Sequence, residues 1–267
     1  MTEGEPLAGG IGNAGAVVRI GDAVLRPAGP HHRAIHALLA HVRAAGFTGT
    51  PEVLGLEPDG RERLRFIPGA VAIPPFPAWA DDEGLLVSAA GLLRSFHDAQ
   101  AGFVAPPGAT WDGEMADPTP GPDPVICHTD PCLENLVVRD GVAVALLDLE
   151  FAAPGRRVWD VAALARYLGP MDPPEVVARA GRRPDLDPVR RLRLVVDAYG
   201  VEGEERAAVV DALGTQMEQG AAFVRRRVAA GEPAFVAMWE TIGGEDRYSA
   251  RAAWFAARRD ALVAGLA

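Results

Sequence analysis

The segment Val125–Glu150 constrains the fold of this 267-residue chain more than any other part of the sequence. It contains three polar residues in the spacing H-x-D-x-x-x-x-N: His128, Asp130 and Asn135. Apolar and β-branched runs then flank the turn-forming residues 139–141, which predicts a β-hairpin. The second strand of this hairpin ends in Asp148, so the chain should return Asp148 to a place beside Asn135.

Residues of these types in this order suit phosphoryl transfer. That reaction needs the acceptor hydroxyl held in line and the charge of the phosphates offset by Mg²⁺. The spacing matches the kinase catalytic loop, in which an aspartate accepts or orients the proton of the acceptor. Asp130 would do this here, while Asn135 and Asp148 would supply the hard oxygen ligands that Mg²⁺ prefers. His128 is expected to support the loop rather than to carry a proton.

Each of these residues also has an ordinary explanation. An aspartate and an asparagine in a turn commonly bond the nearby backbone, and an aspartate at a strand end is commonly solvated. Taken together, with the hairpin between them, the residues favour a phosphotransfer site. Two alternatives remain open: a kinase-fold protein that binds a nucleotide or ligand without transfer, and a metal-dependent hydrolase with His128 and Asp130 as ligands.

The rest of the sequence changes in character along the chain. The first part predicts a glycine-rich turn at 9–15, a helix over 31–45, and strands over 16–20, 23–25, 52–56 and 63–67. The second part predicts a loop over 104–124 and helices over 82–100, 158–168, 187–199, 204–230 and 246–265. Asp187 and Gly200 are the expected caps of one of these helices. We therefore expect an α+β protein with a small β-rich N-lobe over residues 1–69 and a larger, mostly helical C-lobe over residues 70–267.

Composition narrows the functional classes. The formal net charge of −10 argues against nucleic acid as a partner, because its phosphates attract clustered cationic residues. The acidity is compatible with a cationic substrate, although it also serves solubility. No apolar stretch is long enough for a membrane span and the N-terminus lacks the order of a signal peptide, so we expect a cytoplasmic protein. The two cysteines, Cys127 and Cys132, are expected to be reduced.

Three short segments resemble the aminoglycoside phosphotransferase family, the kinase-like enzymes that also include choline-kinase-type members. They are Val125–Asn135, Leu147–Glu150 and Arg157–Ala162. Upstream, Leu64–Gly69 is similar to the strand and hinge that hold adenine in this family, and Leu92–Ala99 is similar to the helix end before the catalytic loop. The resemblance covers most of the chain up to Leu168 and implies a two-lobed, protein-kinase-like fold.

The resemblance also implies an enzyme that transfers a phosphoryl group from ATP, with GTP not excluded, and that uses Mg²⁺. Residue by residue, it implies Asp130 as the catalytic base and Asn135 and Asp148 as magnesium ligands. It further implies adenine contacts from backbone groups near Phe66 and Ile67. The implied acceptor is a hydroxylated small molecule, such as an aminoglycoside or another cationic amine. The sequence does not indicate the oligomeric state.

The chain departs from the family pattern at the lysine that should contact the ATP phosphates. All 26 basic residues are arginine, and Arg26 has the corresponding position at the end of a predicted strand. An arginine can bind phosphate, but its planar fork differs from a compact ammonium group. The predicted helix offers Arg26 no glutamate, which leaves two interpretations: a phosphate-binding residue or a surface arginine before Pro27. We interpret His97 and Asp160 as structural residues, with Asp160 either capping a helix or bonding the catalytic loop.

Overall fold

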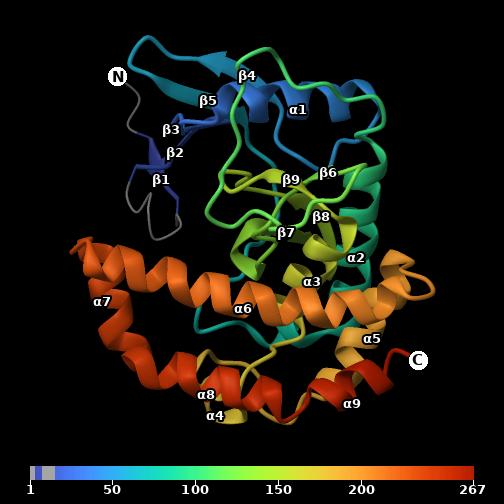
Figure 1. Ribbon diagram of the computed structural model, residues 1–267. Helices are drawn as coiled ribbons and strands as arrows, with labels where there is room; N and C mark the ends of the chain where they lie inside the picture. The colour runs from blue at the N-terminus through green and yellow to red at the C-terminus, as the bar shows by residue number, and fades with distance from the viewer. Residues whose placement is uncertain (1–3, 8–15) are drawn as a thin grey trace.

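The computed structural model describes residues 4–7 and 16–267, so the glycine-rich turn expected at 9–15 lies outside the described residues. Within them, the first part of the chain forms an antiparallel five-stranded sheet in the order β1-β2-β3-β5-β4 (Figure 1). The strands are β1 (Glu5–Pro6), β2 (Val18–Ile20), β3 (Ala23–Pro27), β4 (Val53–Leu56) and β5 (Arg61–Arg65). The strands predicted over 16–20 and 23–25 correspond to β2 and β3, which pair as a hairpin around Gly21, whose φ of 64° suits glycine.

Helix α1 (His32–Ala44) packs beside β4 (Figure 1). Its apolar residues recur every three or four positions, so one face of the helix is buried. The buried side chains are Ala34, Ile35, Leu38, Leu39 and Val42. The predicted helix over 31–45 is therefore confirmed, and together with the sheet it forms a small first lobe.

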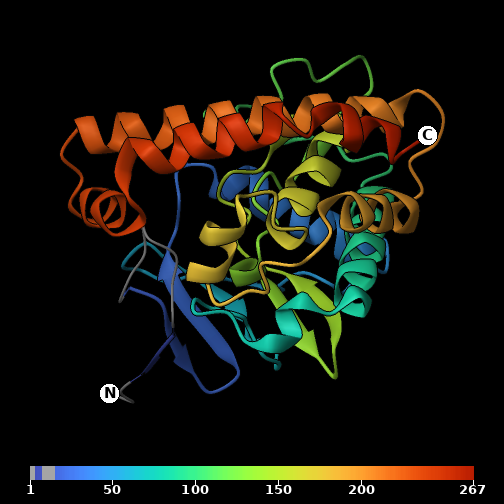
Figure 2. The same cartoon turned by 90° about the horizontal axis from the view of Figure 1, so that it is seen from below.

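The second part of the chain is mainly helical. Its centre contains α2 (Glu83–Asp98), which packs on α5 (Pro188–Tyr199), and α3 (Arg157–Leu168), which packs on the long α6 (Glu205–Ala229). In Figure 1, α6 crosses in front of α3. Figure 2 shows the later helices along the outer side of the molecule. The remaining helical segments are η2 (Ala78–Asp81), α4 (Pro174–Arg179), α7 (Pro233–Ile242), α8 (Gly244–Ala256) and α9 (Arg259–Ala264).

A hairpin and a short two-stranded ladder lie between the sheet and the helices (Figure 1). The strands involved are β6 (Val125–Cys127), β7 (Leu136–Arg139), β8 (Val142–Leu146) and β9 (Ala153–Gly155). The predicted hairpin is β7 with β8, which packs on α2, while β6 pairs with β9. Ala70 and Val138 exchange two backbone hydrogen bonds of 2.8 Å. The chain that leaves the first sheet therefore runs directly along the hairpin.

The C-terminal helices differ from the prediction of one helix over 246–265. A turn at 257–258 divides that range between α8 and α9. Gly243 and Gly244, with φ values of 93° and 58°, separate α8 from α7. The sequence does not predict α4 or α7, and no residue of α7 is fully buried. The helices predicted over 187–199 and 204–230 are present as α5 and α6.

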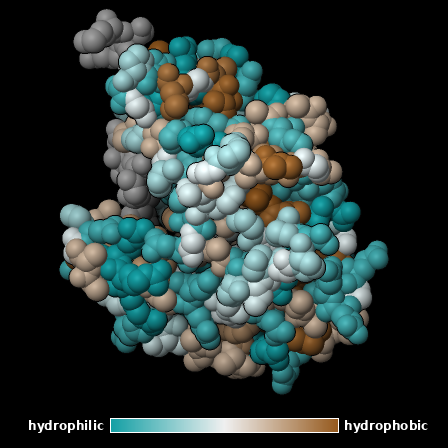
Figure 3. Space-filling view, turned by 45° about the horizontal axis from the view of Figure 1, so that its top comes forward, coloured by the Kyte–Doolittle hydropathy of each residue, from teal (hydrophilic) through white to brown (hydrophobic). Residues whose placement is uncertain are grey.

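In the face that Figure 3 shows, hydrophobic residues form small patches separated by hydrophilic surface. None of the helices in the described part of the chain combines the length and the apolar character needed to cross a membrane. Cys127 and Cys132 are both free thiols, as expected.

Both expected caps of α5 are present. The Asp187 carboxylate accepts hydrogen bonds from the amides of Val189 at 2.9 Å and Arg190 at 3.2 Å. At the other end, Gly200 takes a left-handed conformation with a φ of 84°. These groups satisfy backbone donors and end the helix without strain.

Asp187→Ala is expected to lower the free energy of unfolding by about 1 kcal/mol, because it removes the N-cap of α5. Asp185→Ala is the matched control, since Asp185 is exposed and pairs with the exposed Arg183. Its effect should stay within about 0.5 kcal/mol. Urea denaturation followed by circular dichroism measures both values. Equal losses would contradict the capping role.

Candidate active site

The loop that follows β6 closes on itself through Asn135, the last residue of the turn η3 (Leu133–Asn135). The Asn135 amide nitrogen donates to the backbone oxygen of Asp130 at 3.0 Å and to the Asp130 carboxylate at 3.1 Å. Both partners can only accept hydrogen bonds, so they determine the orientation of the amide. The Asn135 amide oxygen therefore faces elsewhere and has no partner in the described part of the chain.

His128 holds the strand end that precedes Asp148. Its Nε2 donates to the backbone oxygen of Leu147 at 2.7 Å, since a carbonyl oxygen can only accept. The Leu147 amide donates to the backbone oxygen of Asn135 at 2.8 Å. Asp148 follows directly, with a φ of 56° that is uncommon for a residue other than glycine. His128 is fully buried, and its contacts are those of a structural support, as the sequence predicts.

The carboxylate of Asp160 supports the same loop from the side of α3. Asp160 is fully buried and accepts hydrogen bonds from the backbone amides of His128 at 2.6 Å and Thr129 at 2.7 Å. His97 Nε2 donates a third bond at 2.9 Å. Thr129 has a φ of 67°, so the backbone bends sharply where these two amides meet the carboxylate. Of the two expected roles, Asp160 takes the bond to the loop, because the cap position of α3 is Arg156.

His97 connects this carboxylate to α5. Its Nδ1 lies 2.6 Å from the hydroxyl of Tyr199, and Arg157 Nη1 donates to the same oxygen at 3.3 Å. Because His97 Nε2 donates to Asp160 and the Tyr199 oxygen accepts from Arg157, the Tyr199 hydroxyl donates a hydrogen bond to His97 Nδ1. Burial raises the pKa of Tyr199, so its hydroxyl stays protonated and available as a donor.

A metal-dependent hydrolase is not supported by this arrangement. The group of described residues that could surround a metal ion consists of His97, Cys127 and Asp160, whose ligand atoms lie within 4.8 Å of one another. All three are buried, and both ring nitrogens of His97 and both oxygens of Asp160 already have partners. His128 and Asp130 belong to no such group within the described residues.

Arg26 reaches from β3 to the hairpin. Its Nε lies 2.5 Å from Glu62 Oε1, and its Nη1 lies 2.7 Å from Asp148 Oδ1. The Arg26 side chain is 16% exposed and that of Glu62 is 4% exposed. The interpretation of Arg26 as a surface arginine without a carboxylate partner is therefore wrong. The carboxylate comes from the neighbouring strand β5, where Glu62 is the register partner of Arg26.

Helix α1 contributes a histidine, and not a glutamate, to the ion pairs around Arg26. His36 Nε2 lies 2.5 Å from Glu62 Oε2, so Glu62 joins α1 to Arg26. Burial alone would raise the pKa of Glu62, but the hydrogen bond from His36 and the charge of Arg26 lower it. The sequence does not reveal this role, because Glu62 becomes a partner of Arg26 only through the register of β3 on β5.

The expected adenine contacts lie at the end of β5. The Phe66 amide donates to the backbone oxygen of Asp22 at 2.8 Å, so this donor is not available to a ligand. The Arg19 guanidinium covers the Phe66 ring at 3.8 Å from its centroid. The Phe66 carbonyl and the Ile67 amide have no backbone partner within the described residues. The prediction of backbone contacts to adenine near Phe66 and Ile67 therefore now concerns only the Phe66 carbonyl and the Ile67 amide.

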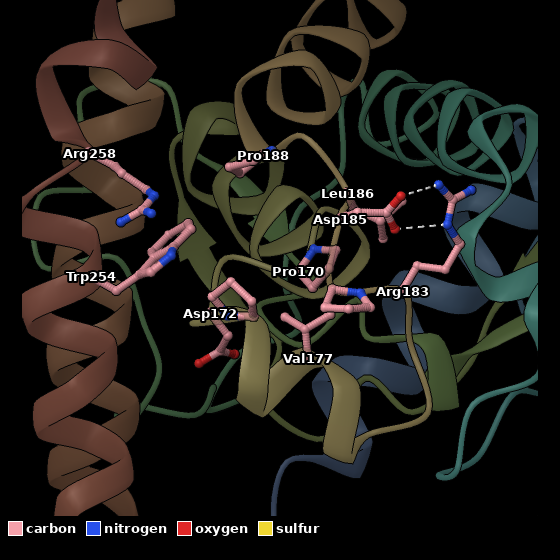
Figure 4. Close-up of a pocket in the computed structure, with 11 residues that line it drawn as sticks. Pro170, Asp172, Val177, Arg183, Asp185, Leu186, Pro188, Trp254 and Arg258 are labelled. Carbon is pink, nitrogen blue, oxygen red and sulfur yellow. Dashed lines mark hydrogen bonds and ion pairs between the residues drawn. The ribbon is translucent and has the colours of Figure 1, made fainter.

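A cavity of about 180 Å³ lies apart from the predicted site residues (Figure 4). Figure 4 shows Arg183 paired with Asp185 on one side of the cavity, and Trp254 of α8 with Arg258 of the turn before α9 on the other. Prolines 170, 174, 184 and 188 form much of its remaining wall. The 128–135 loop does not line this cavity, so the geometry of the loop, rather than the cavity, marks the candidate site.

Comparison with known proteins agrees with this geometry. The profile of a group described as "Phosphotransferase enzyme family" matches residues 106–195, which include the 128–135 loop, the hairpin and Asp160. Trifolitoxin immunity protein from Rhizobium leguminosarum bv. trifolii is 30% identical over 264 residues, which cover 96% of this chain and 97% of that protein. The chain belongs to the phosphotransferase enzyme family.

Solved structures share the fold of this family member. A choline/ethanolamine kinase family protein from Mesorhizobium loti is 20% identical, with a TM-score of 0.63 over 99% of this chain and 92% of that chain. The GDP complex of aminoglycoside 2'-phosphotransferase-IIIa is 12% identical, with a TM-score of 0.57 over 93% of each chain. At these identities the likeness concerns the fold alone. It confirms the predicted α+β, protein-kinase-like fold with a small β-rich lobe and a larger helical one.

Asp160→Asn is expected to lower the free energy of unfolding by on the order of 3 kcal/mol, because an amide cannot accept from all three buried N–H donors. Asp98→Asn is the control. Asp98 is half exposed and pairs with Arg94 and Arg157, so its loss should cost less than about 1 kcal/mol. Urea denaturation measures the free energy of unfolding of both variants. Equal decreases in the two variants would contradict the supporting role of Asp160.

Glu62→Gln is expected to lower the free energy of unfolding at pH 7 by on the order of 2 kcal/mol, because it removes one charge from a buried network. Since the folded-state pKa of Glu62 lies below 4.5, its stabilisation is present above that pH and is lost as the pH falls through the lowered pKa. The difference between wild type and variant should therefore shrink below pH 4.5.

This pH dependence is tested by urea denaturation of wild type and Glu62→Gln at pH values from 7 down to about 3.5, in steps of about half a pH unit. Glu52→Gln is the control on the same sheet, because the Glu52 pair with Arg65 is about two-fifths exposed. Its loss should be under about 1 kcal/mol. A Glu62→Gln penalty that does not change with pH would contradict the ionised state of Glu62.

Proposed function

We propose that this chain is an ATP- and Mg²⁺-dependent O-phosphotransferase that acts on a hydroxyl group of a small molecule. The observation that carries the proposal is the contact of 2.7 Å between Arg26 and Asp148. It joins the sheet to the hairpin at the place where the 128–135 loop presents Asp130 and Asn135. We further propose that residues 1–69 handle the nucleotide and residues 70–267 supply the catalytic loop and the acceptor site.

The oxygen atoms available at this place fit a magnesium ion. The Asn135 amide oxygen has no partner within the described residues, and Asp148 faces Arg26 through one of its two carboxylate oxygens. These are hard oxygen ligands of the kind that Mg²⁺ takes together with phosphate oxygens. When bound, the ion would offset negative charge on the phosphates. Arg26, held by Glu62, would contribute a charge-assisted contact to the same phosphates.

Asp130 would orient the acceptor hydroxyl and accept its proton. The two hydrogen bonds from Asn135 hold the carboxylate and the backbone of Asp130 in one position. The buried Asp160 also holds the loop through the amides of His128 and Thr129, so the Asp130 carboxylate would keep a fixed position relative to the acceptor. A positioned general base of this kind contributes about 10²- to 10⁴-fold to a rate.

The nucleotide would meet the backbone at the end of β5, where the Phe66 carbonyl and the Ile67 amide are available. ATP is the proposed donor, and GTP belongs in the same test because a related fold was solved with GDP. We place the reaction in the cytoplasm as part of this proposal, since that compartment supplies the nucleotide. The proposed acceptor is a hydroxyl-bearing small molecule, with aminoglycosides and other cationic amines included in the test.

A second candidate is a kinase-fold protein that binds its ligand without transfer. Two observations favour it: an arginine stands where the family has a lysine, and one relative is named for immunity to trifolitoxin. Immunity can arise from binding a toxin or from modifying it. Persistent nucleotide binding without turnover on any hydroxylated acceptor would support this candidate.

Calorimetry of ATP·Mg²⁺ and GTP·Mg²⁺ binding tests the proposed site. Asp148→Ala should abolish the magnesium-dependent part of binding, and Arg26→Ala should weaken binding about 10- to 100-fold through loss of a charged contact. Arg63→Ala is the control, since Arg63 lies on β5 of the same sheet and is 47% exposed. Asp130→Asn should leave nucleotide binding unchanged and lower turnover at least about 100-fold.

Failure of well-folded wild-type protein to bind either nucleotide would overturn the phosphotransferase proposal. Equal weakening by Arg26→Ala and Arg63→Ala would show that Arg26 does not contact the phosphates. Binding that is intact in wild type, together with no turnover on any acceptor, would favour the second candidate.

A further inference from the structure

Arg26 forms an ion pair with Asp148, one of the two residues that we propose as magnesium ligands. Arg26 Nη1 lies 2.7 Å from Asp148 Oδ1, and Arg26 Nε lies 2.5 Å from Glu62 Oε1. The exposed fractions of the Arg26, Asp148 and Glu62 side chains are 16%, 20% and 4%, so water screens these charges only in part. Among the described residues, Arg26 is the only one whose positive charge pairs with Asp148. The Asp148 carboxylate therefore already has a counterion within the protein.

Glu62 keeps the Arg26 guanidinium close to Asp148. Glu62 is the register partner of Arg26 on the neighbouring strand, and its second oxygen lies 2.5 Å from His36 Nε2 of α1. The Glu62 carboxylate is thus held by both the sheet and the helix, and it binds Arg26 through Nε rather than Nη1. This contact can remain when Nη1 exchanges Asp148 for another anion. The positive charge of Arg26 consequently stays near Asp148 in either case.

A divalent ion that binds Asp148 without a nucleotide would meet this positive charge. Two cations repel each other strongly where little water screens them. Other ionisable groups are connected to the pair by hydrogen bonds or follow it closely in the chain, namely one histidine and three carboxylates: His36, Glu62, Asp130 and Glu150. The carboxylates attract a metal ion whether or not Arg26 is present. Arg26 is therefore the group in contact with Asp148 that opposes binding of the ion alone.

The phosphates of a nucleotide change this balance. Arginine binds phosphate oxygens through charge-assisted hydrogen bonds, and Mg²⁺ binds phosphate oxygens together with carboxylates. A nucleotide at this place can therefore supply Arg26 with a new partner and offset the charge of the ion at the same time. Asp148 is then available to the ion.

We infer that Arg26 makes binding of the metal ion depend on the nucleotide. Without a nucleotide, Arg26 pairs with Asp148 and opposes the ion; with a nucleotide bound, Arg26 pairs with its phosphates and the ion takes Asp148. The inference rests on the proposed function and describes a regulation of the same site. Only ionic partners are exchanged, and no covalent bond forms or breaks. The planar fork of arginine suits this exchange, because it can contact Glu62 and a second anion simultaneously.

Binding of Mn²⁺ to the nucleotide-free, full-length protein tests the inference. Mn²⁺ takes the same hard oxygen ligands as Mg²⁺, and electron paramagnetic resonance measures its free concentration. Arg26→Gln should raise the affinity for Mn²⁺ at least about five-fold, because it removes the charge that opposes the ion. Arg63→Gln is the matched control, since it removes one positive charge from β5 at a side chain that is 47% exposed. Its effect should stay within about two-fold, because solvent and salt screen an exposed charge.

The expected gain should belong to Asp148. Adding Asp148→Ala to Arg26→Gln should cancel it, and Arg26→Lys should stay close to wild type because it keeps the positive charge. Arg26→Gln leaves the buried Glu62 without its arginine partner, so circular dichroism is needed to show that this variant folds. The double variant Arg26→Gln/Glu62→Gln avoids that unpaired charge. It should bind Mn²⁺ at least about five-fold more tightly than Glu62→Gln alone.

The same titration with bound AMP-PNP tests the dependence on the nucleotide. The phosphates should then bind Arg26, so the advantage of Arg26→Gln over wild type should fall to within about two-fold. An advantage that persists with AMP-PNP bound would overturn the inference. Equal Mn²⁺ affinity of wild type and folded Arg26→Gln, an equal gain in Arg63→Gln, or a gain that survives Asp148→Ala would overturn it as well.

Nucleotide binding separates this inference from the proposed function. If wild type binds ATP·Mg²⁺ and transfers its phosphoryl group while Arg26→Gln shows no gain in Mn²⁺ affinity, the inference is overturned and the phosphotransferase proposal stands. If wild type binds no nucleotide, both are overturned. The Mn²⁺ titration of the nucleotide-free protein and the calorimetry of nucleotide binding are independent measurements, so the two failures are distinguishable.

Discussion

The buried carboxylate of Asp160 is the contact on which the geometry of the candidate site depends. Removing a carboxylate from water is unfavourable unless hydrogen-bond donors replace the water. Here three donors do so, the backbone amides of His128 and Thr129 and the ring of His97. The 128–135 loop is consequently attached to α3 and α2 at once, so the position of Asp130 depends on the packing of two central helices as well as on the hydrogen bonds within the loop.

A second ionic connection joins the sheet to the hairpin. The family arrangement that the sequence suggests would use a lysine and a helical glutamate, but this chain contains no lysine and its helix α1 carries no glutamate. Arg26 instead pairs with Glu62 on the adjacent strand and with Asp148 across the site, while His36 of α1 binds the other oxygen of Glu62. Each charge in this network has an opposite charge within contact, which compensates for burial. A guanidinium can serve both carboxylates because its donors point in different directions.

The overall charge of the molecule and the charge of the side chains around Asp172 have opposite signs. The net charge of −10 reflects many exposed acidic residues, which interact mainly with solvent and salt. Around Asp172, by contrast, two arginines, Arg247 and Arg251, bind one carboxylate in a region with little water. A ligand responds to the nearby, poorly screened charges more strongly than to the distant ones. Composition alone is therefore a poor guide to the local charge in a given part of this chain.

The sequence by itself determined the features that depend on short separations along the chain. The spacing of His128 and Asn135, the hairpin that leads to Asp148 and the caps of α5 are local patterns, because neighbouring residues decide turns and helix ends. The tertiary structure alone decided which distant side chains meet. Glu62 lies 36 positions from Arg26, and Arg251 lies 79 positions from Asp172. Such pairs arise from strand register and helix packing, which the burial of the whole core determines and no local pattern encodes.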